Sequence, residues 1–505
     1  MATAMDMATA TVTGMMKNKL PVRLAGLFSM PPSMSMQTGV SIVLLAFVQA
    51  AWTGDWKLDE SATAAINYVD RSGSDASSGT IVQLSPQVSL KGRGGKSEAD
   101  LNYRLTASKG FGDTDPASLA HSLNARGRME LIDDLFFLGA NAAARLVGDS
   151  STSGAIDSIN VDSSGRQSYS LQLTPEFRHH LNRYADIVSR NTFNYVTYDG
   201  ENVNSDDNSR SVSTHVGVHS GRYFGPVDWR MDVRQTQTKY DLRDDKTTSY
   251  DLGAGYRINH RWRVRGEVGY EKNDIQTNRA DTDGGKWNLG FDWTPNPRTS
   301  VSAQAGKRYL GTVYSGSVRH NTRRTTLSLD FSRDVTNRRV TELLDSFFFL
   351  RDPTTGDFLT DPVTGLPIQV NLPQAQQIDE DYISEQVRGG VSVSGRRTSA
   401  SLTASYTKRD YEVSGSNEDA YSITLAVNRQ LGAHISASLR STLSSTDSGA
   451  ANSSDTRDLQ LTLSKQLSRR TSVNLDLLRR ERDGSINTSD YTENRIGLSL
   501  SSSFF

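Results

Sequence analysis

The chain has 505 residues, of which only 36% are hydrophobic, and its 56 Lys and Arg residues nearly balance 57 Asp and Glu residues. This polarity excludes a bundle of transmembrane helices, each of which needs about 20 apolar residues in succession. The 18 Tyr, 16 Phe and 6 Trp residues argue against disorder, and the balanced charge gives no reason to expect a nucleic-acid partner. Cysteine is absent, which excludes disulfides, iron–sulfur clusters and thiolate sites.

Residues 1–50 are predicted to be a signal peptide with an extended leader. Three basic residues lie between positions 17 and 23, and the apolar run 39–50 follows them and ends in small residues. We expect cleavage near Ala50 or Ala51. The apolar run is shorter than a spanning helix requires, so an uncleaved anchor helix is the less favoured alternative.

Residues 51–505 are predicted to form a single outer-membrane β-barrel. Successive side chains of a strand point to opposite faces, so a barrel wall in lipid alternates apolar and polar residues. The alternation is clear in segments 261–270, 287–293, 327–331, 421–427, 459–463 and 496–500. The first of these reads Arg261-Trp-Arg-Val-Arg-Gly-Glu-Val-Gly-Tyr270, with apolar residues at most even positions and charged residues at most odd positions.

The connections separate a barrel from a soluble sandwich, whose strands also alternate. Short turns are predicted near Arg93-Gly-Gly95, Asp133-Asp134, Leu181-Asn182, Phe224-Gly-Pro226, Asn259-His260, Pro295-Asn-Pro297, Thr336-Asn337, Gly395-Arg396, Leu431-Gly432 and Leu467-Ser468. Longer polar loops are predicted at 148–165, 200–208, 273–285, 414–419, 446–455 and 483–490. Short turns at one rim and long loops at the other are typical of bacterial barrels.

The predicted fold class is therefore all-β, a transmembrane antiparallel up-and-down β-barrel of about 22 strands, within a range of about 18 to 26. Both termini are expected on the periplasmic side, at the rim with the short turns. Aromatic residues at strand ends, such as Tyr184, Tyr223, Trp229 and Trp293, suit the girdles at the membrane interfaces. The expected location is the outer membrane of a Gram-negative bacterium, with outer-membrane lipid around the barrel.

Residues 341–379 are predicted to be a long loop inserted within the barrel. Two Asp-Pro-x-Thr-Gly units, at 352–356 and 361–365, are turn signals, and connections longer than about 15 residues are usually functional or mobile. The apolar cluster 347–350 permits two interpretations. It belongs to a constriction or lid formed by the loop, or it is the upper part of a lipid-facing strand.

The C-terminal segment is predicted to be the last strand. Ile496, Leu498, Leu500 and Phe504 share one face, and Phe505 follows one position out of register. A terminal aromatic residue on an amphipathic strand resembles the targeting signal of outer-membrane proteins. We therefore expect the barrel-assembly machinery to be a partner through Phe505.

No catalytic, phosphate-binding or zinc motif is recognisable, so we expect neither enzymatic activity nor a cofactor. His215 and His219 share a strand face but lie about 13 Å apart at ~3.3 Å per residue, so chelation of a metal would require a neighbouring strand. The run Asp281-Thr-Asp283-Gly284 resembles a calcium loop but lacks its downstream Glu. We therefore expect no metal site.

The inner face of the barrel is where the sequence places function. The residues predicted to line the lumen are Arg261, Arg263, Arg265, Glu267, Asn288, Asp292 and Asp330. Mixed charges and hydroxyl groups suit water and hydroxyl-rich solutes, because weak and repeated binding permits passage. The alternative is that these residues only neutralise one another inside a structural barrel. About 22 strands leave no segment for a plug domain.

Five segments resemble the PEP-CTERM system-associated outer-membrane proteins, and the similarity extends over most of residues 51–505. The segments are 56–70, 82–90, 120–125, 130–137 and 323–333. This chain departs from the family at the end of the first strand, where Tyr68-Val-Asp-Arg71 replaces the usual Tyr-Thr-Asp-Asn.

The resemblance implies a barrel that acts beside exosortase sorting and exopolysaccharide genes. The expected function is exopolysaccharide export by passive passage through a polar lumen, with polysaccharide and periplasmic export proteins as partners. Two alternatives remain open: a structural or assembly barrel for sorting surface proteins, and a general solute porin. The family has no assigned catalytic residues.

Overall fold

The computed structural model describes residues 54–73, 76–113, 118–148, 165–199, 208–240, 244–275, 281–309, 311–336, 347–349, 369–371, 382–412, 414–448, 453–485 and 490–504. The chain divides into two units, Met1–Gln49 and Ala50–Phe505. The predicted signal peptide, its cleavage site and Phe505 lie outside the described residues. The following description concerns the second unit.

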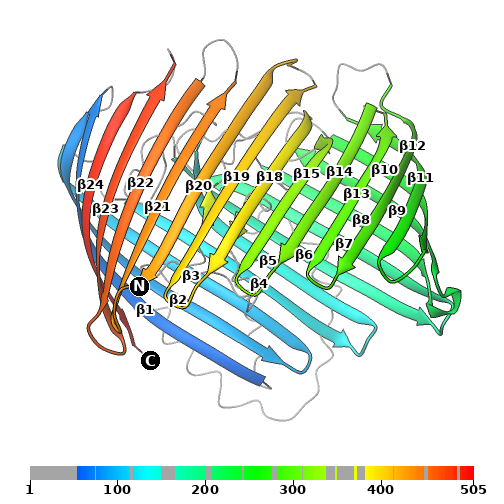
Figure 1. The fold of residues 1–505 in the computed structure, drawn as a ribbon, viewed down its shortest axis with the longest axis horizontal. Coiled ribbons are helices and arrows are strands. Elements are labelled where there is room, and N and C mark those ends of the chain that lie inside the picture. The colour runs from blue at the N-terminus through cyan, green and yellow to red at the C-terminus, as the bar shows by residue number, and fades with distance from the viewer. Residues whose placement is uncertain are drawn as a thin grey trace, which may run out of the picture. The chain divides into compact units, whose positions relative to one another are not determined.

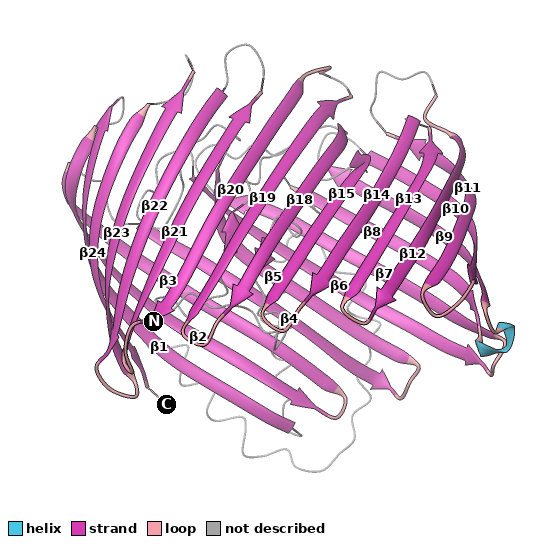
Figure 2. Cartoon of the chain, viewed as in Figure 1, coloured by secondary structure: helices cyan, strands magenta, loops and turns pink. Residues whose placement is uncertain are grey.

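Twenty-two strands form one antiparallel sheet. They are β1 (Gly54–Gly73), β2 (Ser77–Gly94), β3 (Ser97–Gly112), β4 (Ser118–Ile132), β5 (Phe136–Gly148), β6 (Gly165–Leu181), β7 (Ala185–Asp199), β8 (Ser209–Ser220), β9 (Val227–Tyr240), β10 (Asp244–Arg257), β11 (Trp262–Asp274), β12 (Gly284–Asn296), β13 (Thr299–Arg308), β14 (Gly311–Asn321), β15 (Thr325–Thr336), β18 (Tyr382–Ser394), β19 (Thr398–Tyr411), β20 (Asn417–Gln430), β21 (Ile435–Asp447), β22 (Ser453–Gln466), β23 (Thr471–Gly484) and β24 (Tyr491–Ser503). A 3-10 helix, η3 (Arg222–Phe224), connects β8 to β9 (Figure 2).

The sheet closes on itself, because β1 pairs with β24 from Ser61↔Ser503 to Gly73↔Tyr491. The remaining strands of this sheet each pair with the strand before and the strand after them in the chain. Strand β15 pairs with β18 across the segment that separates them. Figure 1 shows the strands following one another obliquely around the wall. The prediction of an antiparallel up-and-down barrel of about 22 strands is confirmed.

Among the described residues, no helix is long and apolar enough to cross a membrane.

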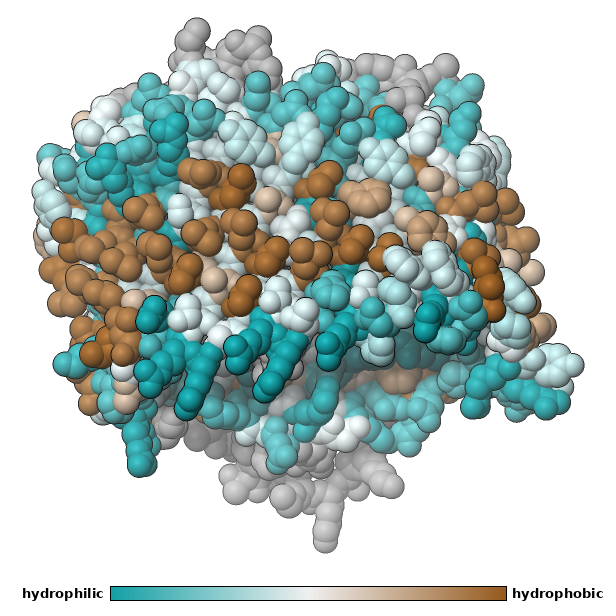
Figure 3. Space-filling model, in the orientation of Figure 1, coloured by the Kyte–Doolittle hydropathy of each residue, from teal (hydrophilic) through white to brown (hydrophobic). Residues whose placement is uncertain are grey.

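The outer face of the barrel is apolar. Large hydrophobic side chains are exposed on strands all around the sheet, among them Ile66, Leu84, Met231, Leu252, Val268, Leu289, Leu402, Ile423 and Leu498. Figure 3 shows a hydrophobic band with hydrophilic residues above and below it. An apolar exposed surface of this extent marks a contact with lipid or protein, and its band form is that of an outer-membrane barrel.

Polar side chains occupy the opposite face of the wall. Asn67, Gln83, Ser422, Asn474 and Glu493 are buried, and each is adjacent in sequence to an outward-facing residue. This distribution is the inverse of that in a soluble protein, where buried side chains are mostly apolar. It separates the barrel from the soluble sandwich that the alternating pattern alone would also permit.

Aromatic residues gather at the rim with the short turns. The rings of Trp262 and Trp293 stack with centroids 5.3 Å apart. Between β6 and β9, Tyr223 contacts Tyr184 at 5.0 Å between centroids, and Phe224 contacts Trp229 at 5.7 Å. Rings that are apolar on one side and polar at the edge suit a membrane interface.

Most of the predicted turns lie where the sequence placed them. Asp134 and Asn182 occupy two of the short turns with φ of 54°, a backbone conformation that Asp and Asn tolerate better than most residues. The turn predicted at Thr336-Asn337 is wrong, because β15 ends at Thr336 and begins the long connection to β18. The short turn at the other end of β15 is 322–324, which was not predicted.

The two rims of the barrel also differ less in the length of their connections than predicted. Short connections occur on the rim with the long loops, at 241–243 between β9 and β10 and at 309–310 between β13 and β14. Within the segment 341–379, β16 (Phe347–Phe349) pairs with β17 (Gln369–Asn371) in a separate two-stranded sheet. These phenylalanines therefore do not extend a barrel strand, and the rest of that segment lies outside the described residues.

Candidate functional site

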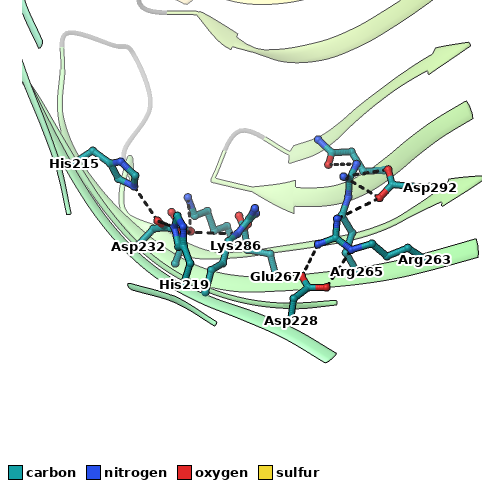
Figure 4. A network of polar contacts seen from close by, with 12 residues as sticks. His215, His219, Asp228, Asp232, Arg263, Arg265, Glu267, Lys286 and Asp292 are labelled. Atoms are coloured by element: carbon teal, nitrogen blue, oxygen red, sulfur yellow. Dashed lines mark hydrogen bonds and ion pairs between the residues drawn. The ribbon is translucent and has the colours of Figure 1, made fainter. Parts of the chain in front are cut away.

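The candidate site is a network of charged side chains on the inner face of β8 to β15. Strand β9 shows how the sequence builds it. Trp229, Met231 and Val233 face outward, and the alternate residues are Asp228, Arg230, Asp232 and Arg234. Because the neighbouring strands pair in continuous register, their charged positions fall on the same face. Figure 4 shows part of the network along the curved wall.

One end of the network joins three of the predicted lumen residues. Arg263 forms an ion pair with Asp228, to whose Oδ1 its Nε donates at 3.1 Å. Arg265 lies 3.3 Å from Asp292 through Nη1 and Oδ1, and its Nη2 donates to Gln304 at 3.3 Å. The guanidinium groups are thus held by acceptors on strands on both sides of β11.

The middle of the network connects β9, β10, β11, β12 and β13. Glu267 pairs with Arg230. The Nζ atom of Lys286 lies 2.7 Å from Asp251 and 3.1 Å from Glu271. Glu271 is 3% exposed and also accepts from Arg308, at 3.0 Å between Oε1 and Nη2. A buried charge is stable only when paired and hydrogen-bonded, and here each one has a partner one or two strands away.

His215 and His219 meet at one carboxylate. Their Nε2 atoms lie 2.8 Å and 3.1 Å from the same oxygen, Oδ1 of Asp232 on the neighbouring strand. The side chains therefore converge although their positions on β8 are distant. Among the described residues, no group of three or more His, Cys, Asp or Glu side chains is placed to hold a metal ion.

Gly217 makes room for this cluster. A Cβ atom at that position would lie 2.5 Å from Oδ1 of Asp232 and 2.9 Å from Nε2 of His219. We expect Gly217→Ala to lower the free energy of unfolding by about 1 kcal/mol, the lower end of the usual cost of overpacking, because the atoms in its way are side-chain ends whose shift would lengthen the contacts between the histidines and Asp232. The measurement is a urea titration of the barrel in phospholipid vesicles, followed by tryptophan fluorescence.

Gly139→Ala provides the matched control, because a Cβ atom on Gly139 would meet only atoms of Thr174, at 3.6 Å. This is an ordinary van der Waals distance, so we expect almost no change in stability. Equal losses for both variants would show that Gly217 has no special role in accommodating the His–Asp cluster.

The structure places the remaining predicted residues as follows. Arg261 lies in the turn before β11, at the rim, where its Nε donates to His260 at 3.2 Å. Asn288 lies on β12 and lines a cavity with Glu267. Asp330 lies on β15 and lines a second, smaller cavity with Arg265.

Most of the partners in the network were not predicted. Asp228, Arg230 and Asp232 form the ion pairs of β9, and Lys286 and Arg308 bridge β10 to β13. The run Asp228-Trp-Arg-Met-Asp-Val-Arg234 alternates charged and apolar residues as strictly as any segment of the chain. That pattern was the available signal for the network.

A cavity of about 590 Å³ lies over this network, lined by residues of β8 to β15. Its lining combines the paired charges with hydroxyl and amide groups such as Ser249, Ser315 and Gln304. A volume of several hundred cubic ångströms is in the range of small-molecule sites. The arrangement offers many hydrogen bonds to a solute, together with apolar contact from residues such as Val313 and Tyr314.

The inner face of β19 to β24 differs in character, because hydroxyl and amide groups predominate over charges. Thr424 and Thr442 hydrogen bond at 3.2 Å, and Asn474 donates to Ser499 at 3.2 Å. Ion pairs also occur on this side, between Arg409 and Glu418 and between Arg480 and Asp458. The whole inner wall is therefore ion-paired, and it is richer in hydroxyl groups over β19 to β24.

The sequence matches no protein-family model and no curated protein. Among solved structures, the barrel is similar to the siderophore receptor PirA from Acinetobacter baumannii, with 9% identity over 88% of this chain and 80% of that chain and a TM-score of 0.47. It is also similar to the FrpB iron transporter from Neisseria meningitidis, with 11% identity over 91% and 83% of the two chains and a TM-score of 0.45. Likeness at this level carries no information about ligand or function.

Proposed function

We propose that the protein is an outer-membrane barrel of a Gram-negative bacterium that takes part in exopolysaccharide export by passive passage through its lumen. The observation that carries passage is the contrast between the two faces of one wall. Apolar residues such as Val264 and Val268 face outward, whereas Arg263, Arg265 and Glu267 form ion pairs on the inner face.

The inner wall suits a hydrated, hydroxyl-rich solute. Most of its charges are paired with one another, so along most of the wall a passing solute meets donors and acceptors without a strong binding partner. Exchange of water hydrogen bonds for wall contacts brings little net free energy, and weak binding at many sites permits movement. The resemblance to the PEP-CTERM system-associated outer-membrane proteins supplies the proposal that this solute is an exopolysaccharide.

Two measurements test the proposal. Purified barrel in a planar lipid bilayer is expected to conduct ions, and deletion of the gene is expected to trap polymer in the periplasm. A silent bilayer together with loss of sorted surface proteins would favour an assembly barrel instead. Conductance with normal polymer secretion would favour a general solute porin.

A further inference from the structure

The charged side chains that line the cavity over β8 to β15 are almost all paired with one another. Its carboxylates all have a base within ion-pair distance: they are Asp232, Asp251, Glu267, Glu271 and Asp334. The lining therefore presents no uncommitted carboxylate among the residues that the structure describes. A cation entering the cavity would have to displace an existing partner.

Arg234 is the exception among the bases of this cavity. It lies on β9, lines the cavity and is exposed, and it forms no ion pair or hydrogen bond with a side chain in the described part of the chain. Its neighbours across the two adjacent strands are His215 and Ser249. No carboxylate stands opposite it, so its guanidinium group is available to an anion from solution.

The side chains around Arg234 indicate which other groups a ligand with an anionic group would carry. Thr247, Ser249 and Gln304 line the same cavity and both donate and accept hydrogen bonds. Asn288 lines the same cavity, and a side-chain amide can both donate and accept hydrogen bonds. Groups of this kind suit the hydroxyl groups of a sugar.

We propose that this cavity binds an acidic saccharide unit, with a carboxylate of the sugar on Arg234 and sugar hydroxyl groups on Asn288 and its polar neighbours. The inference rests on the proposed function and names the class of polymer that passes: an anionic, hydroxyl-rich one. A guanidinium group binds a carboxylate through two parallel hydrogen bonds, which distinguishes an acidic sugar from a neutral one of equal length.

Arg319 provides a matched control. It lies on β14 between Ser300 and Ser328, at a position that the register assigns to the inner face. It is exposed and does not line the cavity, and like Arg234 it has no ion-pair partner among the residues described. Arg319→Gln therefore removes an equal charge from the wall without touching the proposed site.

The test measures binding of hexagalacturonate and of maltohexaose to the full barrel in detergent by calorimetry. We expect the acidic hexasaccharide to bind at least about tenfold more tightly than the neutral one, since a charge-assisted pair contributes about that much. Arg234→Gln is expected to abolish this preference by weakening hexagalacturonate binding to the level of maltohexaose binding. Arg319→Gln is expected to retain the preference for the acidic sugar. Arg234→Lys keeps the charge but not the two parallel N–H donors of the guanidinium group, so we expect it to show an intermediate preference.

Equal affinity of the wild-type protein for the two sugars, or equal behaviour of Arg234→Gln and Arg319→Gln, would overturn the site. Heat-modifiable gel migration of each variant establishes that its barrel is folded. Conductance of the same preparations separates the two proposals. A conducting barrel without acid preference overturns only the site, whereas acid-selective binding to a barrel that does not conduct overturns passage and keeps the site.

Discussion

Glu493→Gln is expected to destabilise the barrel by about 3–5 kcal/mol, the usual loss when one partner of a buried ion pair is removed. The Glu493 side chain is 0% exposed and lies on β24, the last strand of the barrel. It pairs with Arg71 on β1 at 2.9 Å and with Arg495 at 2.6 Å. The substitution leaves both guanidinium groups at the closing seam facing a neutral amide in place of the carboxylate.

The measurement is a urea titration of the barrel in phospholipid vesicles. Glu481→Gln provides the control, because Glu481 pairs with Arg479 within β23 and both side chains are substantially exposed, at 34% and 59%. An exposed pair contributes about 0–1 kcal/mol. If Glu493→Gln were no more destabilising than Glu481→Gln, the seam would not depend on this buried carboxylate.

Leu498→Arg is expected to cost about 2–4 kcal/mol, the penalty for an arginine on the lipid face at the middle of the bilayer. Leu498 is 52% exposed and lies on β24 beside Ile66 of β1 and Leu475 of β23. Its apolar neighbours offer no hydrogen-bond acceptor, so the guanidinium group must reach the interface or draw water into the hydrocarbon.

Asn494→Arg tests the same strand and face at a different depth. Asn494 lies four residues nearer the loops and is exposed, beside Asp70 and Arg479, where the penalty falls to about 0–1 kcal/mol. Both variants are compared by urea titration in vesicles and by heat-modifiable migration. Equal costs at the two positions would contradict the assignment of the apolar band to the bilayer core.

Much of the barrel was predictable because its strands carry a local signal. The alternation in 261–270 and 496–500 depends only on adjacent residues, and β11 and β24 include both segments except the turn residue Arg261. The short turn predicted at Thr336-Asn337 is wrong because the prediction depended on local residues alone. A local pattern shows where β15 ends, but it does not show whether a short turn or the connection to β18 follows.

The sequence by itself determined the alternating strands, the two chemical faces and most turns, since each depends on residues within one strand or hairpin. Only the tertiary structure decided which charges meet. Arg71 and Glu493 are separated by 422 positions and become neighbours through closure of the sheet. His215 and His219 converge on Asp232 because β8 and β9 pair in one register. A slip of one residue would turn every side chain of a strand to the opposite face, so cross-strand contacts exist only once closure has set the register.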